Sequence, residues 1–312
     1  MNHYPDVSGP DPDQHPALAL LLAELRERHQ QRINCVLLYG SCLRSGDIFD
    51  GLLDLYLICD DYRSSYPRRA LALSNWLLPP NVFYAQVEHE DKVLRSKVTV
   101  ISVADFRSGC SPAWFESYIW GRFAQPTRVI YARDEASRAA IEVCLLDAAR
   151  TLLRRSLPAL PAAGSLSMLW QQALGLSYAT ELRTERSGRA AELVGAAAGF
   201  YETISRQLAD SLGFPFEVYD NNDSAHYRCH ITPRSRRLAL LGWHLRRVQG
   251  KGLSIARLIK ALFTFEGGLD YIAWKLERHS GEKIVIPDKV RRLPLIYLWG
   301  FFWGLYRRGI FK

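Results

Sequence analysis

Two short apolar runs, joined through a glycine-serine turn, constrain the fold more than any other feature of the sequence. The first run, Asn34 to Tyr39, ends at Gly40-Ser41, and the second, Leu52 to Cys59, contains Asp54. Runs of this length that are closed by turn-forming residues are typical of strands buried in a sheet. The pattern therefore predicts two buried strands, with a tight turn after the first and a carboxylate within the second.

The flanking segments predict an α/β architecture for the first half of the chain. Leucine and alanine recur at helical spacing from Pro16 to Gln30, and a helical pattern returns from Glu135 to Leu157. Two further strands are expected at Asn81 to Val87 and Lys97 to Ser102, joined by the charged residues 88–92. Together these elements predict a mixed sheet surrounded by helices.

The second half of the chain is expected to be mainly α-helical. Residues 158–164, rich in proline and alanine, predict a linker. Segments rich in alanine, leucine and arginine follow at Leu166 to Leu182, Ala190 to Leu212 and Arg236 to Phe265. We therefore predict an α/β domain at residues 1–157, a mainly helical domain at 158–288 and a separate terminal segment at 289–312.

Charge and cysteine content limit the partners and the compartment. The 312 residues carry a formal net charge of +8, which attracts nucleotide phosphates, nucleic acid or anionic lipid without choosing among them. The six cysteines include no C-x-x-C pair, so neither a zinc site nor a disulfide framework is indicated. The polar N-terminus lacks the apolar core of a secretory signal, and we expect a cytoplasmic protein.

The residues around the predicted turn suit a nucleoside triphosphate. Gly40 would let the backbone approach phosphates, Ser41 and the N–H groups of the turn would donate to them, and Asp54 would hold Mg²⁺ against them. This arrangement is similar to the opening of polymerase-β-like nucleotidyltransferases. Most of those carry two carboxylates spaced D-x-D, whereas Tyr56 stands at the second position here. The alternative is a tight strand exit followed by a surface acid.

Most of the chain resembles the mitochondrial-type phosphatidate cytidylyltransferases, the translocator assembly and maintenance family. The family's Y-G-S-G-V corresponds to Tyr39–Leu43, and its L-D-F-h-F-x-V-D-D to Leu53–Asp61, so a non-acidic residue two places after the aspartate is usual there. Similar segments follow in the same order at Asn81–Tyr84, Lys97–Ser102, Tyr118–Pro126 and Leu176–Arg183. The resemblance implies a nucleotidyltransferase domain that uses Mg²⁺ to make CDP-diacylglycerol from CTP and phosphatidic acid.

The resemblance also implies roles for individual residues. Gly40 and Ser41 would cradle the triphosphate, Asp54 would be the metal ligand, and Lys97 would reach the β- and γ-phosphates. Arg122 would clamp a phosphate through two donors. The alternatives are a solvated charge on a strand edge for Lys97 and a surface arginine for Arg122.

Two further nucleotide-binding residues are expected on one helical segment. Tyr178 and Arg183 would face a common cleft together with Glu181, where the family has aspartate. The second metal carboxylate is left open among Asp60, Asp61, Glu88, Glu90 and Asp105.

The C-terminus suggests contact with a membrane. Leu293 to Tyr306 is apolar and aromatic, and basic residues lie on both sides of it. Fourteen residues are too few to cross a bilayer, whereas tryptophan and tyrosine with basic flanks suit the headgroup region of an anionic membrane. We therefore predict an interfacial anchor and a peripheral protein on the inner face of the cell membrane; a terminal helix docked on the core is the alternative.

Three functions remain after these observations. The first is a phosphatidate cytidylyltransferase, and the second is a nucleotidyltransferase for RNA or a small hydroxylated acceptor. The third is an inactive nucleotide-binding module, because only one metal carboxylate is identified. No nucleic-acid partner is expected, since the densest aromatic and basic cluster is C-terminal rather than near the predicted cleft. The oligomeric state is left open.

Overall fold

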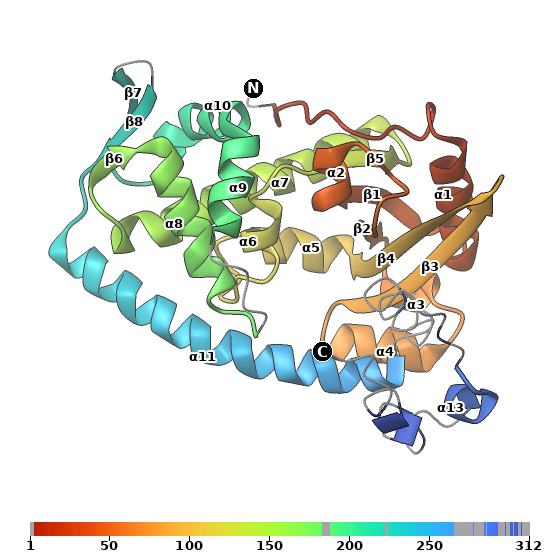
Figure 1. Ribbon diagram of the computed structural model, residues 1–312. Helices are drawn as coiled ribbons and strands as arrows, with labels where there is room; N and C mark the ends of the chain where they lie inside the picture. The colour runs from red at the N-terminus through yellow and green to blue at the C-terminus, as the bar shows by residue number, and fades with distance from the viewer. Residues whose placement is uncertain are drawn as a thin grey trace.

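The computed structural model describes residues 3–182, 188–221, 224–264 and 286–292, with isolated positions at 277, 284, 297, 300, 301, 303, 304 and 307. A five-stranded sheet with helices on both faces forms one end of the molecule, and a mainly helical part with a smaller sheet forms the other (Figure 1). The long helix α11 (Pro233–Thr264) runs along both parts.

The main sheet is mixed, with strand order β3-β4-β2-β1-β5. β2 and β4 pair in parallel, and the other neighbours are antiparallel. This confirms the expected mixed α/β architecture; β5 was not predicted, and β4 begins five residues earlier than expected. The strands are β1 (Ile33–Tyr39), β2 (Leu53–Cys59), β3 (Asn81–His89), β4 (Lys92–Ser102) and β5 (Arg128–Ala132).

Both faces of the sheet are buried, which explains the uninterrupted apolar runs. Cys35 and Leu37 of β1 belong to one hydrophobic cluster, and the alternate residues Val36 and Leu38 belong to another. The second cluster packs against α1 (Pro16–Arg28). Short helices connect the strands: α2 (Ser41–Ser45), α3 (Tyr62–Ser65), α4 (Arg69–Leu77), α5 (Val103–Cys110) and α6 (Trp120–Phe123).

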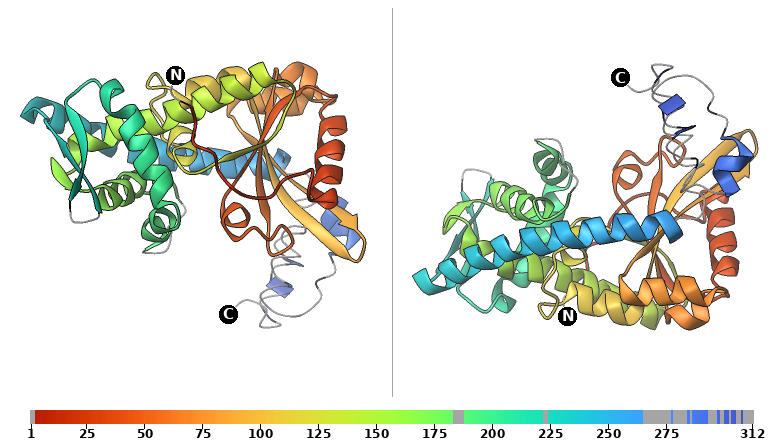
Figure 2. Two further views of the ribbon diagram at one scale, coloured as in Figure 1. Left: turned by 90° about the horizontal axis from the view of Figure 1, so that it is seen from above. Right: turned by 90° about the horizontal axis from the view of Figure 1, so that it is seen from below.

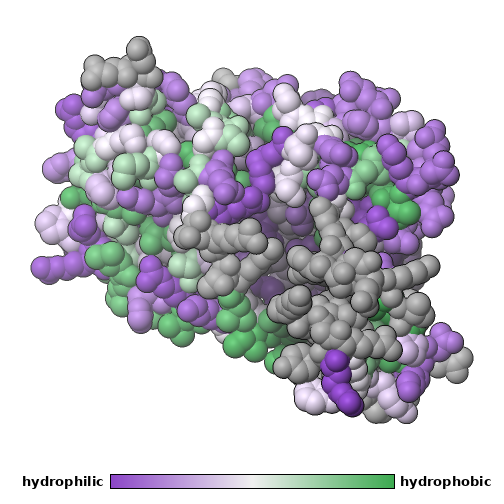
Figure 3. Space-filling view, viewed as in Figure 1, coloured by the Kyte–Doolittle hydropathy of each residue, from purple (hydrophilic) through white to green (hydrophobic). Residues whose placement is uncertain are grey.

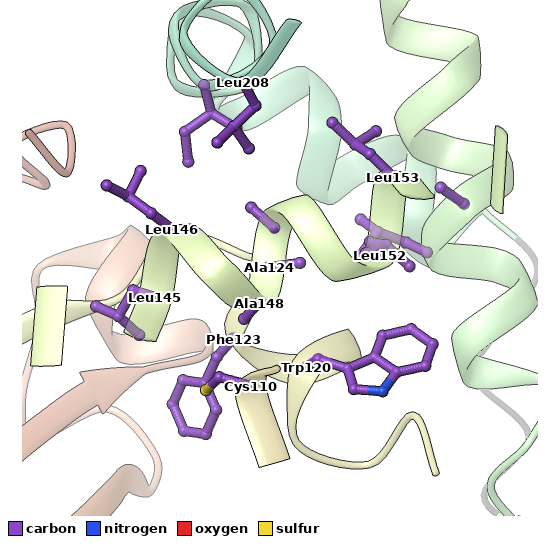
Figure 4. Packing of buried hydrophobic residues seen from close by; sticks show 14 of the residues in the cluster. Cys110, Trp120, Phe123, Ala124, Leu145, Leu146, Ala148, Leu152, Leu153 and Leu208 are labelled. Atoms are coloured by element: carbon purple, nitrogen blue, oxygen red, sulfur yellow. The ribbon is translucent and has the colours of Figure 1, made fainter. Parts of the chain in front are cut away.

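The first hydrophobic cluster extends from the sheet into the helical part. Figure 4 shows Phe123 and Trp120 of α6 beside Leu145 and Leu152 of α7, and the same cluster includes Trp243 of α11. It thus contains residues on both sides of the boundary expected at residue 157. The helices beyond α6 are α7 (Glu135–Ser156), α8 (Leu166–Tyr178), α9 (Arg189–Ala196), α10 (Ala198–Leu208) and α13 (Asp288–Arg292).

The segment expected to be a linker is structured. Residues 157–159 form a 3-10 turn, and β6 (Ala163–Ser165) pairs with β8 (Ser224–Cys229), which pairs with β7 (Phe216–Asn221). Tyr227 of β8 fixes this sheet, because its ring packs against Phe216 and its hydroxyl donates to the Pro161 carbonyl at 2.8 Å. The small sheet was not predicted, since its strands have three to six residues and little alternation.

The middle of α11 contacts the end of α8 very closely. A Cβ atom at Gly250 would lie 2.5 Å from the carbonyl oxygen of Thr180, whereas one at Gly252 would meet nothing within 4 Å. We expect Gly250→Ala to destabilise the protein by about 1–3 kcal/mol through overpacking. Gly252→Ala should be neutral or stabilising by up to about 1 kcal/mol, because alanine favours helix. Urea unfolding of both variants checks this, and equal midpoints would contradict the close packing.

Candidate active site

A cavity of about 580 Å³ lies at one end of the central strands of the main sheet, where β1 ends and β2 begins. Six of the seven predicted site residues line it: Gly40, Ser41, Asp54, Lys97, Arg122 and Tyr178. The seventh, Arg183, lies outside the described residues. The rest of the lining is Tyr39, Arg44, Gly121, Gln125, Ser177, Glu181, Arg189, Glu192 and Leu193.

Three adjacent strands bring Tyr39, Asp54 and Lys97 into one row. Asp54 of β2 lies opposite Tyr39 of β1 and beside Lys97 of β4. The Lys97 Nζ is 3.9 Å from the Asp54 Oδ1, and the two side chains are 33% and 28% exposed. An ion pair this loose and this exposed is weak, so the carboxylate and the ammonium can each turn to a ligand in the cavity.

The turn after β1 requires glycine. Gly40 has a φ of +90°, and a Cβ atom there would lie 2.7 Å from Asp54 Oδ2. The absence of a side chain therefore keeps the Asp54 carboxylate accessible beside the turn. Ser41 follows as the first residue of α2 and is exposed.

Arg44 holds this turn and was missed in the sequence analysis. Its guanidinium donates to the Gly40 carbonyl at 2.9 Å. Burial lowers the pKa of Arg44, and the positive charge of the neighbouring Arg189 lowers it further. Two guanidiniums that repel each other at the wall of a cavity favour an anion between them. The position of Arg44 three residues after Ser41 could have indicated a role beside the turn.

Arg122 is a partly buried cation in the wall of the cavity, held in place by several contacts. It pairs with Glu181 at 3.3 Å and donates to the Tyr56 hydroxyl at 3.4 Å. The guanidinium also lies over the Tyr118 ring, 4.3 Å from its centre. Burial alone would lower the pKa of Arg122, but Tyr118, Tyr39 and Glu181 outweigh it and raise the pKa. The side chain therefore stays charged.

Tyr56, at the second position of the D-x-D pattern, has a structural role. Its ring is fully buried and packs edge to face on Phe123, with ring centres 4.8 Å apart. Its hydroxyl supports Arg122. A carboxylate at this position would be buried in the hydrophobic cluster, so the tyrosine serves to position the arginine instead.

The helix expected from Leu166 to Leu182 ends at Tyr178. Thr180 ends it, because its hydroxyl donates to the Ser177 carbonyl and bonds the Ser117 hydroxyl, each at 2.7 Å. Glu181 therefore reaches the cavity from the turn after the helix rather than from the helix itself.

None of the candidates for a second metal carboxylate lines this cavity. Asp60 pairs with Arg133, Asp61 caps α3, and Asp105 accepts a hydrogen bond from Tyr62, all near the opposite end of β2. Glu88 and Glu90 lie at the tip of the β3–β4 hairpin, beyond the row that contains Lys97.

The residues around the cavity fit Mg²⁺ only if substrate phosphates and water supply most of its ligands. Among the described residues, no group of three or more histidines, cysteines or acids could hold a metal. Mg²⁺ keeps several waters and is commonly bound by one or two carboxylates together with substrate phosphates. Asp54 beside the Gly40-Ser41 turn is suited to an ion that is shared with a triphosphate.

No protein-family model matches this chain, and no curated protein matches it. Among solved structures, a nucleotidyltransferase-like protein from Exiguobacterium sibiricum matches over 94% of this chain and 91% of its own length, with 12% sequence identity and a TM-score of 0.26. A functional proposal therefore rests on the residues of the cavity itself.

Proposed function

We propose that the protein is a nucleotidyltransferase, and more specifically a phosphatidate cytidylyltransferase. The observation that carries the proposal is the convergence of the Gly40-Ser41 turn, the Asp54 carboxylate and four cations on one cavity. Catalysis of phosphoryl and nucleotidyl transfer consists mainly of positioning and charge stabilisation. These residue types supply both.

In the proposed reaction, a phosphate oxygen of phosphatidic acid attacks the α-phosphorus of CTP. The bond from that phosphorus to the oxygen bridging to the β-phosphate breaks, and pyrophosphate leaves with the bonding electrons. Because the attacking oxygen is already anionic, no general base is required. This agrees with the absence of histidine from the described residues that line the cavity.

Each residue has a distinct task in this proposal. The turn at Gly40 and Ser41 binds the triphosphate, and Lys97 and Arg44 balance charge on the phosphates that leave. Arg122, fixed by Glu181 and Tyr118, orients the attacked or attacking phosphate. Asp54 would hold Mg²⁺, which when bound supplies neutralisation of the charge that develops on the pyrophosphate.

The choice of substrates rests on the family resemblance of the sequence. The test is to incubate the purified protein with Mg²⁺, phosphatidic acid vesicles and each labelled nucleoside triphosphate in turn. We expect a lipid-soluble labelled product with CTP. If product forms only with RNA or a soluble alcohol, the protein is a nucleotidyltransferase but phosphatidic acid is not its acceptor. No product with any nucleotide or acceptor would reject the enzyme.

Ser41→Ala should weaken the enzyme without abolishing it. The variant loses one hydrogen bond to a charged phosphate, worth about 1.5–3 kcal/mol, so kcat/KM should fall by about tenfold to a hundredfold. Ser45→Ala, at the other end of α2 and outside the cavity lining, is the matched control. Equal rates for the two variants would remove the Ser41 hydroxyl from phosphate binding.

A further inference from the structure

Helix α11 carries an apolar stripe that is exposed to solvent. The stripe residues recur three, four or seven positions apart and so lie along one side of the helix. In Figure 3, hydrophobic residues gather along the lower edge of the molecule, where Figure 1 shows α11. Each side chain is about half exposed or more: Leu238, Leu241, Leu245, Val248, Ile255 and Ile259.

The charge on α11 is of one sign. Its 32 residues include eight arginines and lysines and no aspartate or glutamate. Arg246, Arg257 and Lys260 bond to groups of the protein itself. The other five are exposed, although Arg236 also donates to the Leu160 carbonyl at 3.3 Å: Arg234, Arg236, Arg237, Arg247 and Lys251.

Helix α4 adds aromatic surface at one end of this helix. Lys260 donates to the carbonyl of Leu78, and Arg257 to that of Pro79, so the C-terminal part of α11 lies at the end of α4 (Figure 2). On α4, Leu73, Trp76 and Leu77 are exposed, Trp76 by 67%. Exposed tryptophan beside a basic, apolar helix is typical of membrane interfaces.

This charge distribution excludes other ways to cover the stripe. A second copy of α11 would bring five exposed cations against five, and the helix carries no acid to pair them. The chain's own residues 265–312 contain nine lysines and arginines against five acids and are also net positive. Nucleic acid would match the cations but not the leucines. An anionic lipid surface matches both.

We infer that the apolar stripe of α11, extended by the exposed residues of α4, is the surface with which the protein lies on an anionic membrane. The helix is about 48 Å long and would lie in the plane of the interface, with its stripe among the acyl chains and its exposed cations at the headgroups. Within the described residues, no helix is long and apolar enough to cross a bilayer.

The same helix contacts the wall of the candidate active site. Arg257 pairs with Glu116 at 2.6 Å and lies 4.2 Å from the centre of the Tyr118 ring, and Arg122 also lies over that ring. Thr180, next to Glu181, packs against Gly250. Docking on α11 would therefore bring the cavity close to the lipid surface. Only this last step rests on the proposed function, since a bilayer can be bound without nucleotide transfer.

The test measures binding of the full-length protein to vesicles of phosphatidylcholine with or without phosphatidylglycerol, and without nucleotide or phosphatidic acid. We expect binding only to the anionic vesicles. Leu245→Asp with Val248→Asp should reduce it by at least about tenfold, because each buried aliphatic side chain contributes about that factor. Val143→Asp on α7 is the matched control, because Val143 and Val248 are 55% and 64% exposed.

Reversal of the charges on α11 tests the electrostatic part of the inference. Arg247→Glu with Lys251→Glu should reduce binding at least about twentyfold.

Several outcomes would overturn the inference. One is undiminished binding by the stripe variants while deletion of residues 293–312 abolishes it, since the terminal segment would then be the sole anchor. A vesicle-free dimer that Val248→Asp dissociates would assign the stripe to a second copy. Preferential binding of an oligonucleotide over vesicles would assign the cations to nucleic acid. Unfolding of the stripe variants, detected by circular dichroism, would place the stripe in the core. Because this assay contains no substrate, its result is independent of whether CTP is used.

Discussion

Asp54→Asn is expected to abolish nucleotidyl transfer while leaving the protein folded. The amide retains the volume of the side chain but removes the negative charge that would hold Mg²⁺ beside the Gly40-Ser41 turn. Loss of this charge should reduce kcat by about a thousandfold or more, equivalent to about 4 kcal/mol. The thermal midpoint should change little, because the Lys97 ion pair is loose and exposed.

Asp60→Asn provides the matched control. Asp54 and Asp60 are both 28% exposed and both pair with a cation, but Asp60 pairs with Arg133, away from the cavity. The control should transfer nucleotide at a normal rate. Near-normal transfer by Asp54→Asn, measured with labelled CTP, would exclude Asp54 from the mechanism. Inactivity of both variants would point to a general effect on the fold.

Arg122→Ala is expected to have the second largest effect. The guanidinium is the most enclosed cation of the cavity, held by Glu181, Tyr56 and Tyr118. Removal of a charge so well positioned for a phosphate should cost about a hundredfold to a thousandfold in kcat/KM. Arg122→Lys should recover only part of the rate, since an ammonium cannot donate in the bidentate geometry of a guanidinium.

Arg128→Ala is the corresponding control, because Arg128 also pairs with an acid, Asp11, and lies outside the cavity. The double variant Arg122→Ala with Glu181→Ala separates structure from catalysis. In the single variant Glu181 loses the cation that it pairs with, and the double variant removes this unpaired acid as well. The double variant should therefore fold at least as well as the single variant and remain inactive. Recovery of transfer in the double variant would show that Arg122 only neutralises Glu181.

The parts of the fold that could be predicted are those fixed by local pattern. β1 and β2 were expected within one residue at either end, because strands buried on both faces are apolar throughout. The turn at Gly40 and the acid at Asp54 were found for the same reason, since each interrupts an apolar run. β5 escaped prediction because it is a five-residue edge strand.

The parts of the site that could not be predicted come from distant segments. Arg189 and Glu192 reach the cavity from α9, and no local motif marks them. Their ion pair at 3.5 Å would suit any exposed helix face. Arg189 comes near Arg44 because α9 and α2 line the same cavity. Tertiary contact of this kind leaves no spacing signal in the chain.

Tyr39, Asp54 and Lys97 lie in one row only when the three central strands pair in the correct register. Successive side chains of a strand point to opposite faces, so a slip of β2 by one residue would turn Asp54 from the cavity into the other hydrophobic layer. Lys97 joins the row only when β4 pairs in parallel with a strand 43 residues earlier in the chain, a non-local step that is expected to be slow. Recovery of activity during refolding should therefore follow recovery of helical signal, and would report when the central three strands have aligned.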